Sequence, residues 1–198
     1  MNGKPRILVT GSRGFLGSSL LPVLSTIYDI VEYEGDVRVY RQYDNIDVVM
    51  HLASPSDTVE FEDIERTVYT IVIGTEILLN IAIKNNATFI FASTKGAGNA
   101  INLYESCKLA VELYIKRLYS KYVILRIPRV YGVHRKKGLM RKIRQNLVSE
   151  SDMHNIVSYI TIDSFISQTV DNLHSTGSTV EYTSLQQDSI KYIKEIFC

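Results

Sequence analysis

Cysteine is scarce in this chain, whose 198 residues include only Cys107 and Cys198. Two cysteines make neither a disulfide framework nor a metal-ligand spacing, so we expect a reducing compartment and no metal site. An excess of charge of one sign is lacking as well, because 22 Lys and Arg residues stand against 21 Asp and Glu residues. This balance gives no electrostatic reason to expect nucleic acid or an anionic membrane as a partner.

Long apolar runs are lacking too. The first residues, MNGKPRILVTG, have no apolar core of a signal peptide, and no stretch of about 18 consecutive apolar residues could span a bilayer. We therefore expect a cytoplasmic protein. The hydrophobic fraction of 45% and the charged fraction of 22% are ordinary for a folded globular chain, and the length suits one α/β domain.

Strand-like and helix-like segments alternate along the chain. Short runs rich in Val, Ile and Leu predict buried strands, and apolar residues three and four apart predict helices. Expected strands cover residues 6–10, 28–33, 36–39, 47–52, 88–92, 122–126 and 157–160, and expected helices cover 63–85, 103–120, 137–148, 163–173, 189–197 and a segment that follows the turn at residue 11 and ends near residue 27. This alternation predicts an α/β fold with a doubly wound parallel sheet, covered by helices on both faces.

A glycine-rich turn, GSRGFLG at residues 11–17, follows the first expected strand and opens the first helix. Gly11 permits a tight turn, Gly14 lets the backbone approach phosphate groups, and Gly17 lets the helix pack closely. The free N–H groups and the positive dipole end of a helix attract a diphosphate. Glycine also occurs in ordinary turns. The motif favours dinucleotide binding because it lies between an expected strand and an expected helix.

The choice between NAD and NADP depends on charges that follow this turn. An acidic residue about 20 positions on hydrogen-bonds the adenosine ribose of NAD, and Glu34 and Asp36 both lie there. Glu34 would repel the additional phosphate of NADP, whereas Arg13 could pair with it. NAD is favoured and NADP stays open, and all three residues could also be solvated surface charges.

Eight short segments follow one another in a characteristic order: ILVTGSRGFLG (7–17), GDV (35–37), DVVMHLAS (47–54), GTEILL (74–79), FIFAST (89–94), YESCKLAVE (104–112), ILRIPRVYG (124–132) and YITIDSF (159–165). In this order the sequence resembles the extended short-chain dehydrogenase/reductases, in the NAD-dependent epimerase/dehydratase branch that acts on nucleotide sugars. The resemblance implies a single Rossmann-like domain over residues 1–198. Its cofactor-binding core would cover about 1–130 and a reduced substrate-facing part about 131–198.

The same resemblance implies a set of cofactor-binding residues. These residues come from the glycine turn, from the segment after the second strand, and from the end of the strand at 47–52 and the residues that follow it. Two residues of the expected helix at 103–120 complete the set. The set is Gly11, Arg13, Gly14, Phe15, Leu16, Gly17, Glu34, Asp36, Val37, Leu52, Ala53, Ser54, Tyr104 and Lys108.

Tyr104 and Lys108 match the catalytic Tyr and Lys of the resembled family, and Thr94 matches its Ser/Thr, with Ser93 as the alternative. The Y-x-x-x-K spacing puts both side chains on one face of a helix. A cation one turn away is expected to lower the pKa of Tyr104, so that its phenol can act as acid and base. Thr94 would hydrogen-bond the reacting sugar oxygen. A core tyrosine and a solvated lysine would give the same spacing.

Several positions depart from the family pattern. Lys95 and Gly96 follow Thr94, where the family's sugar-nucleotide 4,6-dehydratases have an Asp-Glu pair. A dehydratase is therefore disfavoured, and an epimerase or a 4-keto reductase remains. Nine residues separate Thr94 from Tyr104 and twelve separate Glu34 from Asp47, so the substrate-contacting insertions are short.

The shortened substrate region leaves two alternatives open. The chain could be a cofactor-binding protein without turnover, acting as a sensor or a subunit, or a homodimer could supply the missing substrate walls. A basic cluster at 134–137 and 141–144 would, by the resemblance, help to bind the diphosphate of a nucleotide sugar, although a solvated helix face accounts for it equally well.

Overall fold

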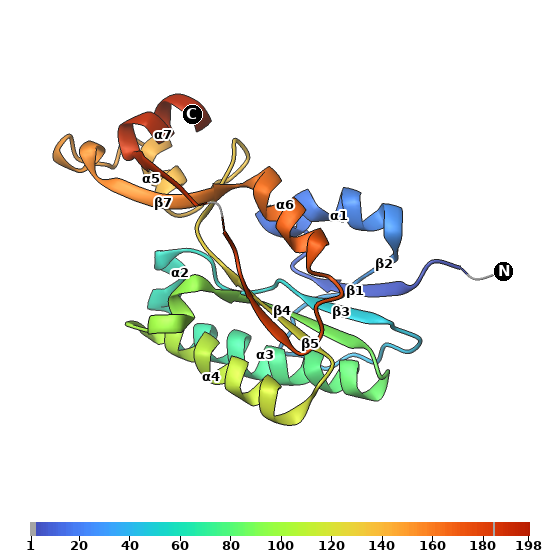
Figure 1. Cartoon of the computed structure of the whole chain (residues 1–198). Coiled ribbons are helices and arrows are strands. Elements are labelled where there is room, and N and C mark those ends of the chain that lie inside the picture. Colours follow the sequence, from blue (N-terminus) through green and yellow to red (C-terminus); the bar gives the residue numbers. More distant parts are fainter. Residues whose placement is uncertain (1–2, 184) are drawn as a thin grey trace.

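A six-stranded parallel sheet forms the centre of the computed structural model, which describes residues 3–183 and 185–198 (Figure 1). The strand order is β2-β1-β3-β4-β5-β8. The strands are β1 (Arg6–Thr10), β2 (Asp29–Glu32), β3 (Val48–His51), β4 (Thr88–Thr94), β5 (Tyr122–Ile127) and β8 (Ser178–Glu181). Every neighbouring pair in this sheet runs parallel, as the sequence predicts for a Rossmann-like fold.

Helices cover both faces of this sheet. In Figure 1, α1 and α6 lie over one face and α3 and α4 over the other. Successive strand residues point to opposite faces. Ile7 and Val9 of β1 therefore join the apolar core under α1 and α6, while Leu8 joins the core under α3 and α4. The helices are α1 (Phe15–Ile27), α3 (Ile64–Lys84), α4 (Leu103–Leu118) and α6 (Ile162–Asp171).

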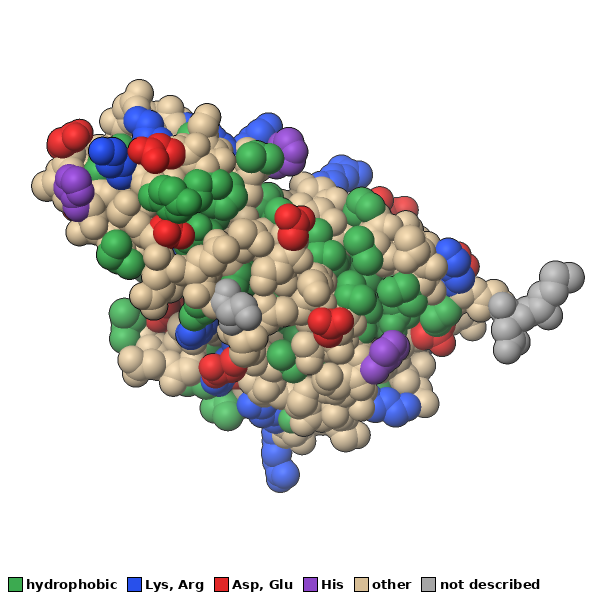
Figure 2. Space-filling model, turned by 45° about the horizontal axis from the view of Figure 1, so that its top comes forward, with side chains coloured by type: hydrophobic (Ala, Val, Ile, Leu, Met, Phe, Trp, Pro, Cys, Tyr) green, Lys and Arg blue, Asp and Glu red, His purple; other side chains and the backbone are tan. Residues whose placement is uncertain are grey.

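Helix α3 is the one helix in the described part of the chain that is long and apolar enough to cross a membrane. It contacts β3, β4 and α4, and it buries Ile71, Leu78 and Leu79 against the sheet. Its apolar character is thus accounted for by core packing. On the face shown in Figure 2, acidic and basic side chains are scattered rather than gathered by sign.

A small lobe lies beside the large sheet and contains most of the C-terminal part (Figure 1). Its strands have the order β6-β7-β9, and its core stacks Tyr131 on Tyr159, with ring centroids 4.9 Å apart, and the edge of Phe197 against both. Its elements are β6 (Val130–Tyr131), β7 (Ile156–Thr161), β9 (Gln186–Ser189), α5 (Leu139–Arg144), α7 (Ile190–Phe197) and the short 3-10 helix η2 (Ser151–His154). The chain leaves this lobe to add α6 and β8 to the large unit.

The expected strand at 36–39 is wrong. Asp36 instead begins a turn, in which its carbonyl accepts from the Val39 N–H at 3.0 Å and its carboxylate accepts from Arg38. A Rossmann sheet usually has a further strand outside the second one. Twelve residues between Glu34 and Asp47 are too few for a crossover to such a strand, so β2 is an edge of the described sheet.

Candidate active site

The glycine turn joins β1 to α1 in a conformation that only glycine allows at two positions. Gly11 has φ +70°, and a Cβ there would lie 2.8 Å from the Ala53 nitrogen. A Cβ on Gly17 would lie 2.2 Å from the Gly11 carbonyl oxygen. Gly14 is the N-cap of α1 and offers no side-chain cap, so the first N–H groups of the helix stay available to an anion.

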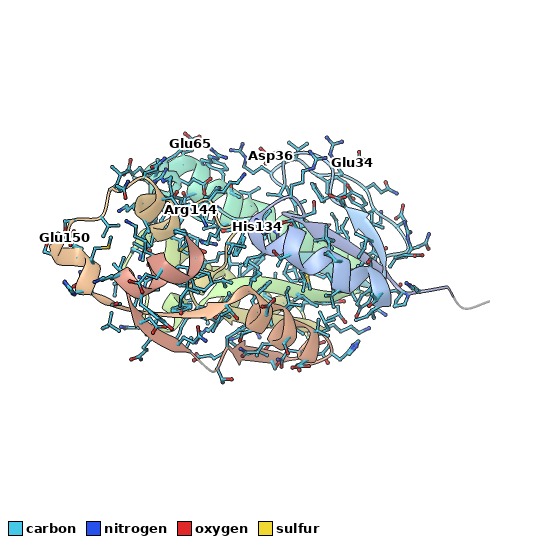
Figure 3. The ribbon with its side chains drawn as sticks, turned by 90° about the horizontal axis from the view of Figure 1, so that it is seen from above. Glu34, Asp36, Glu65, His134, Arg144 and Glu150 are labelled. Carbon is cyan, nitrogen blue, oxygen red and sulfur yellow. The ribbon has the colours of Figure 1, made fainter. Side chains whose placement is uncertain are left out.

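A cavity of about 1010 Å³ opens beside this turn, at the carboxyl ends of β1 and β2. Figure 3 shows two of its acidic residues, Glu34 and Asp36, on the loop that follows β2. The residues of the expected cofactor set that line the cavity are Gly11, Arg13, Gly14, Glu34, Asp36, Val37 and Ala53.

The other members of the expected set lie deeper in the molecule or further along the sheet edge. Phe15, Leu16 and Leu52 pack against the core under α1 and α6, and Gly17 is buried beneath the turn. Ser54 follows Ala53 and is close enough to Tyr104 to affect its pKa. The structure thus divides the expected set among the open cavity, the core under α1 and α6, and the region around Tyr104.

Three charged residues of the cavity, Glu32, Arg38 and Arg66, lie outside the expected set. Glu32 ends β2, two residues before the expected acidic position, and its carboxylate accepts from the Ser12 hydroxyl at 2.5 Å. Arg66 reaches the cavity from α3. Sequence spacing could not reveal Arg66, because α3 approaches β2 only through the folded sheet. Asp36 pairs with Arg38 at 2.6 Å, and these hydrogen bonds lower the pKa of Asp36.

Lys108 lies behind the end of β4, on helix α4. Its Nζ donates to the Ala92 carbonyl at 2.7 Å and stands 4.5 Å from the centroid of the Phe91 ring. Burial lowers the pKa of Lys108 to about 7, and the Glu112 carboxylate opposes this shift. His51, buried nearby, has its pKa lowered to about 3 by burial and then by the charge of Lys108. The imidazole is therefore neutral.

The carboxylate of Glu112 is the centre of a buried network. It accepts from the Ser93 hydroxyl at 2.5 Å and from the Arg126 guanidinium at 2.8 Å. Arg126 also pairs with Glu181 of β8 at 3.1 Å. Ser93 is therefore engaged by this network, whereas Thr94 ends β4 with its hydroxyl accepting from the Gly96 N–H at 3.3 Å.

Tyr104 lies under an aromatic cover. The Phe61 ring, from α2 (Thr58–Glu62), stacks on it with centroids 4.4 Å apart and planes inclined by 19°. Burial raises the pKa of Tyr104, while the Ser54 hydroxyl and the Arg135 guanidinium oppose this. The expected lowering of this pKa by Lys108 is wrong for this structure, because desolvation outweighs the nearby charges and the Lys108 ammonium donates to Ala92 instead.

The basic cluster is largely engaged by the protein itself. Lys137 pairs with Glu60 at 2.6 Å, and Arg141 with the buried Asp57 at 3.4 Å. Arg144, which Figure 3 labels together with His134, donates to the carbonyls of Val133 and Phe197. Arg135 lies over the Phe15 ring at 5.3 Å. No sequence signal singled out Phe61, whereas Arg135 belongs to the basic cluster that the sequence indicated.

The fold and the glycine turn define a Rossmann-like protein with an open cavity of about 1010 Å³ at the carboxyl ends of β1 and β2. The model of the NAD dependent epimerase/dehydratase family matches residues 7–155, and the chain therefore belongs to this family. No curated protein matches the chain.

Solved structures with the same fold include enzymes of three kinds. The UDP-glucuronic acid 4-epimerase from Bacillus cereus, in complex with NAD, is 25% identical, with a TM-score of 0.74 over 94% of this chain and 81% of that one. A dTDP-glucose 4,6-dehydratase from Streptomyces venezuelae with NAD bound is 18% identical, with a TM-score of 0.80 over 97% and 80%. The dTDP-4-dehydrorhamnose reductase from Bacillus anthracis, with NADP, is 19% identical, with a TM-score of 0.76 over 100% and 81%. Family and neighbours together support a nicotinamide dinucleotide as the cofactor.

Proposed function

We propose that this protein is an NAD(P)-dependent epimerase or 4-keto reductase that acts on a nucleotide-activated sugar. The observation that carries the proposal is the position of Tyr104 and Lys108. Helix α4 sets Lys108 against the carbonyl of Ala92 in β4, and it sets Tyr104 one turn earlier, near Ser54. Ser54 follows Ala53, which lines the cavity beside the glycine turn. Ligands of parallel α/β sheets bind at this edge.

The residues of the glycine turn fit a dinucleotide diphosphate. Gly11 and Gly17 leave no room for side chains, and Gly14 leaves the N-terminus of α1 uncapped. Bound there, a nicotinamide dinucleotide would supply the capacity to accept and return a hydride. Glu34, Arg13 and Arg66 surround the cavity, which keeps both NAD and NADP as candidates.

In this proposal, Tyr104 holds or accepts the proton at its phenolic oxygen, and Thr94 donates a hydrogen bond to the same sugar oxygen. Lys108 positions α4 against β4 and holds a charge close to the Tyr104 ring, 5.8 Å from its centroid. Lys95 and Gly96 provide no carboxylate after Thr94, which favours an epimerase or reductase over a dehydratase. A homodimer and a cytoplasmic location stay predictions from the sequence.

A second candidate function, a cofactor-binding protein without turnover, is favoured by one observation. Phe61 covers Tyr104, and burial raises the pKa of the phenol, so a protein fixed in this arrangement would bind a cofactor and leave a sugar unchanged.

Replacing Tyr104 by Phe separates the two candidates. The substitution removes the proton-transfer group, so turnover of UDP- and dTDP-sugars should fall at least ~10²-fold. The shift of the thermal midpoint by NAD or NADP should persist, because the phenol is not needed to hold the diphosphate. Tyr114→Phe, on the exposed side of the same helix, is the matched control. Equal turnover in Tyr104→Phe and Tyr114→Phe would refute the catalytic role.

A further inference from the structure

Helix α2 lies directly against the residue on which the proposed chemistry depends. Its Phe61 is stacked on Tyr104 at 4.4 Å with nearly parallel rings. A stacked neighbour occupies one face of the phenol and removes water from it. This contact explains physically why burial is the largest influence on Tyr104 and why its pKa is raised.

Contacts from a distant part of the chain hold α2 in this place. The Lys137 ammonium pairs with Glu60 at 2.6 Å, and the Arg141 guanidinium with Asp57 at 3.4 Å. The Gly138 N–H also donates to Asp57 Oδ2 at 3.2 Å. Lys137 and Gly138 come from the segment that leads from β6 into α5 of the small lobe, and Arg141 lies in α5 itself. The small lobe therefore fastens α2 to Tyr104.

Of these contacts, the Lys137–Glu60 pair lies at the surface and can be exchanged for other partners. The Lys137 side chain is 49% exposed and that of Glu60 24% exposed, and such ion pairs contribute only about 0–1 kcal/mol. The neighbouring Phe61–Tyr104 stack is worth about as much beyond its buried area. Helix α3 adds one neutral hydrogen bond, from the buried Thr67 hydroxyl to the Glu60 carbonyl at 3.1 Å, which contributes about 0.5–1.5 kcal/mol.

We propose that α2 is a lid over Tyr104, fastened by the Lys137–Glu60 and Arg141–Asp57 pairs, and that the lid must move before a sugar can reach the phenol. This inference rests on the proposed function, since it gives Tyr104 the task of meeting the substrate. An anionic substrate such as a nucleoside diphosphate sugar would compete with Glu60 and Asp57 for the two cations. The negative charge of the substrate would thus help to release the lid and give the sugar access to the Tyr104 phenol.

Nitration by tetranitromethane tests the lid without cofactor or sugar, because the reagent modifies accessible phenols. Modification of Tyr104 is followed by peptide mass spectrometry, with the exposed Tyr40 and the buried Tyr182 in the same digest as upper and lower references. In the unaltered protein, the partly buried Tyr104 should react several times more slowly than Tyr40.

Two variants open the lid in different ways. Phe61→Ala removes the cover and should raise the nitration rate of Tyr104 at least about tenfold. Lys137→Gln removes one fastening and should raise it about two- to fivefold. The matched controls are Val59→Ala, exposed on the same helix, and Lys136→Gln, exposed beside Lys137, and both should leave the rate unchanged.

The lid would be overturned if Tyr104 were nitrated as fast as Tyr40 in the unaltered protein. It would also be overturned if Lys137→Gln left the nitration rate of Tyr104 unchanged. Lys137 lies on the surface, so its variant keeps the test valid even if Phe61→Ala fails to fold. Failure of the proposed function would instead be seen in the turnover of Tyr104→Phe, which nitration does not measure.

Discussion

At the carboxyl edge of the large sheet, β1 and β2 end beside an open cavity, whereas β3 and β4 end beneath other side chains. The open end is built from backbone: Gly11 and Gly17 fix the turn, and the N-terminus of α1 has no side-chain cap. The closed end is built from side chains of α2 and α4, with Phe61 over Tyr104 and Lys108 behind β4.

This difference shows that the open end already has the geometry to bind an anion, whereas the closed end would have to rearrange before a ligand could contact Tyr104. A diphosphate would find its N–H donors already in place, since these are fixed by the turn itself. A sugar would have to displace Phe61 to reach Tyr104, and the raised pKa of that phenol would fall as water and charge return. If the proposed function holds, cofactor binding should tolerate changes at the closed end, and turnover should depend on both ends.

The largest effect is expected from breaking the open end. Gly17→Ala would place a Cβ 2.2 Å from the Gly11 carbonyl oxygen, with only backbone atoms to yield. Overpacking of this kind should cost about 2–4 kcal/mol of unfolding free energy and abolish the thermal shift by cofactor. Denaturant unfolding and thermal shifts check both results. Gly3→Ala is the control, because a Cβ there meets nothing within 4 Å, and it should behave as the unaltered chain. A Gly17→Ala protein that still binds cofactor would contradict the inference that the glycine turn must keep this conformation to bind the diphosphate.

A smaller effect, with the opposite sign, is expected at Lys108. Its pKa falls from 10.5 to about 7 on folding, so the unfolded chain holds the proton more tightly, and this weakens the folded state increasingly as the pH falls from 10.5 towards 7. Lys108→Met should therefore be more stable than the unaltered protein by about 1–3 kcal/mol at pH 7, after the lost bond to Ala92 is counted.

The advantage of Lys108→Met should shrink as the pH rises towards 10.5 and stay constant below about pH 7, where both states are protonated. Thermal midpoints across this pH range measure it. Lys116→Met, exposed on the same helix, should show no such trend, and a pH-independent difference for Lys108→Met would rule out a strained ammonium.

The smallest effect is expected on the relative affinity of the cavity for NADP and NAD. Glu34→Gln removes a negative charge from the cavity and should improve the affinity for NADP relative to NAD about three- to tenfold, whereas Arg13→Ala should change the ratio by a similar factor in the opposite direction. Both residues are exposed, which keeps the effect small and salt-dependent. Titrations with both cofactors at two ionic strengths measure the ratio, and identical ratios in both variants would leave Glu34 and Arg13 without a role in cofactor choice.

Local sequence patterns predicted the strands and helices that a few consecutive residues are enough to identify. The runs at 6–10, 47–52 and 122–126 are strands, and the apolar spacing at 63–85 is helix α3. The strands β8 and β9 were missed because STVE and QQDS carry no apolar alternation. These strands form because a partner edge, β5 or β7, is already present. The turn at 36–39 was mistaken for a strand because its apolar residues resemble one.

The glycine turn and the pair of Tyr104 and Lys108 could be found in the sequence because each depends on neighbours within a turn or two of the chain. Their surroundings could not be found in this way. Lys137 meets Glu60 across 77 positions, and Phe61 meets Tyr104 from another helix.

The sequence by itself determined most of the strands and helices of the large sheet, the glycine turn and the family, because steric limits and periodicity act locally. Only the tertiary structure decided that β2 is an edge, that Ser93 belongs to a buried ion network, and that the phenol of Tyr104 is covered. Desolvation and ion pairing depend on which distant segments meet, and this is fixed only when the whole chain packs.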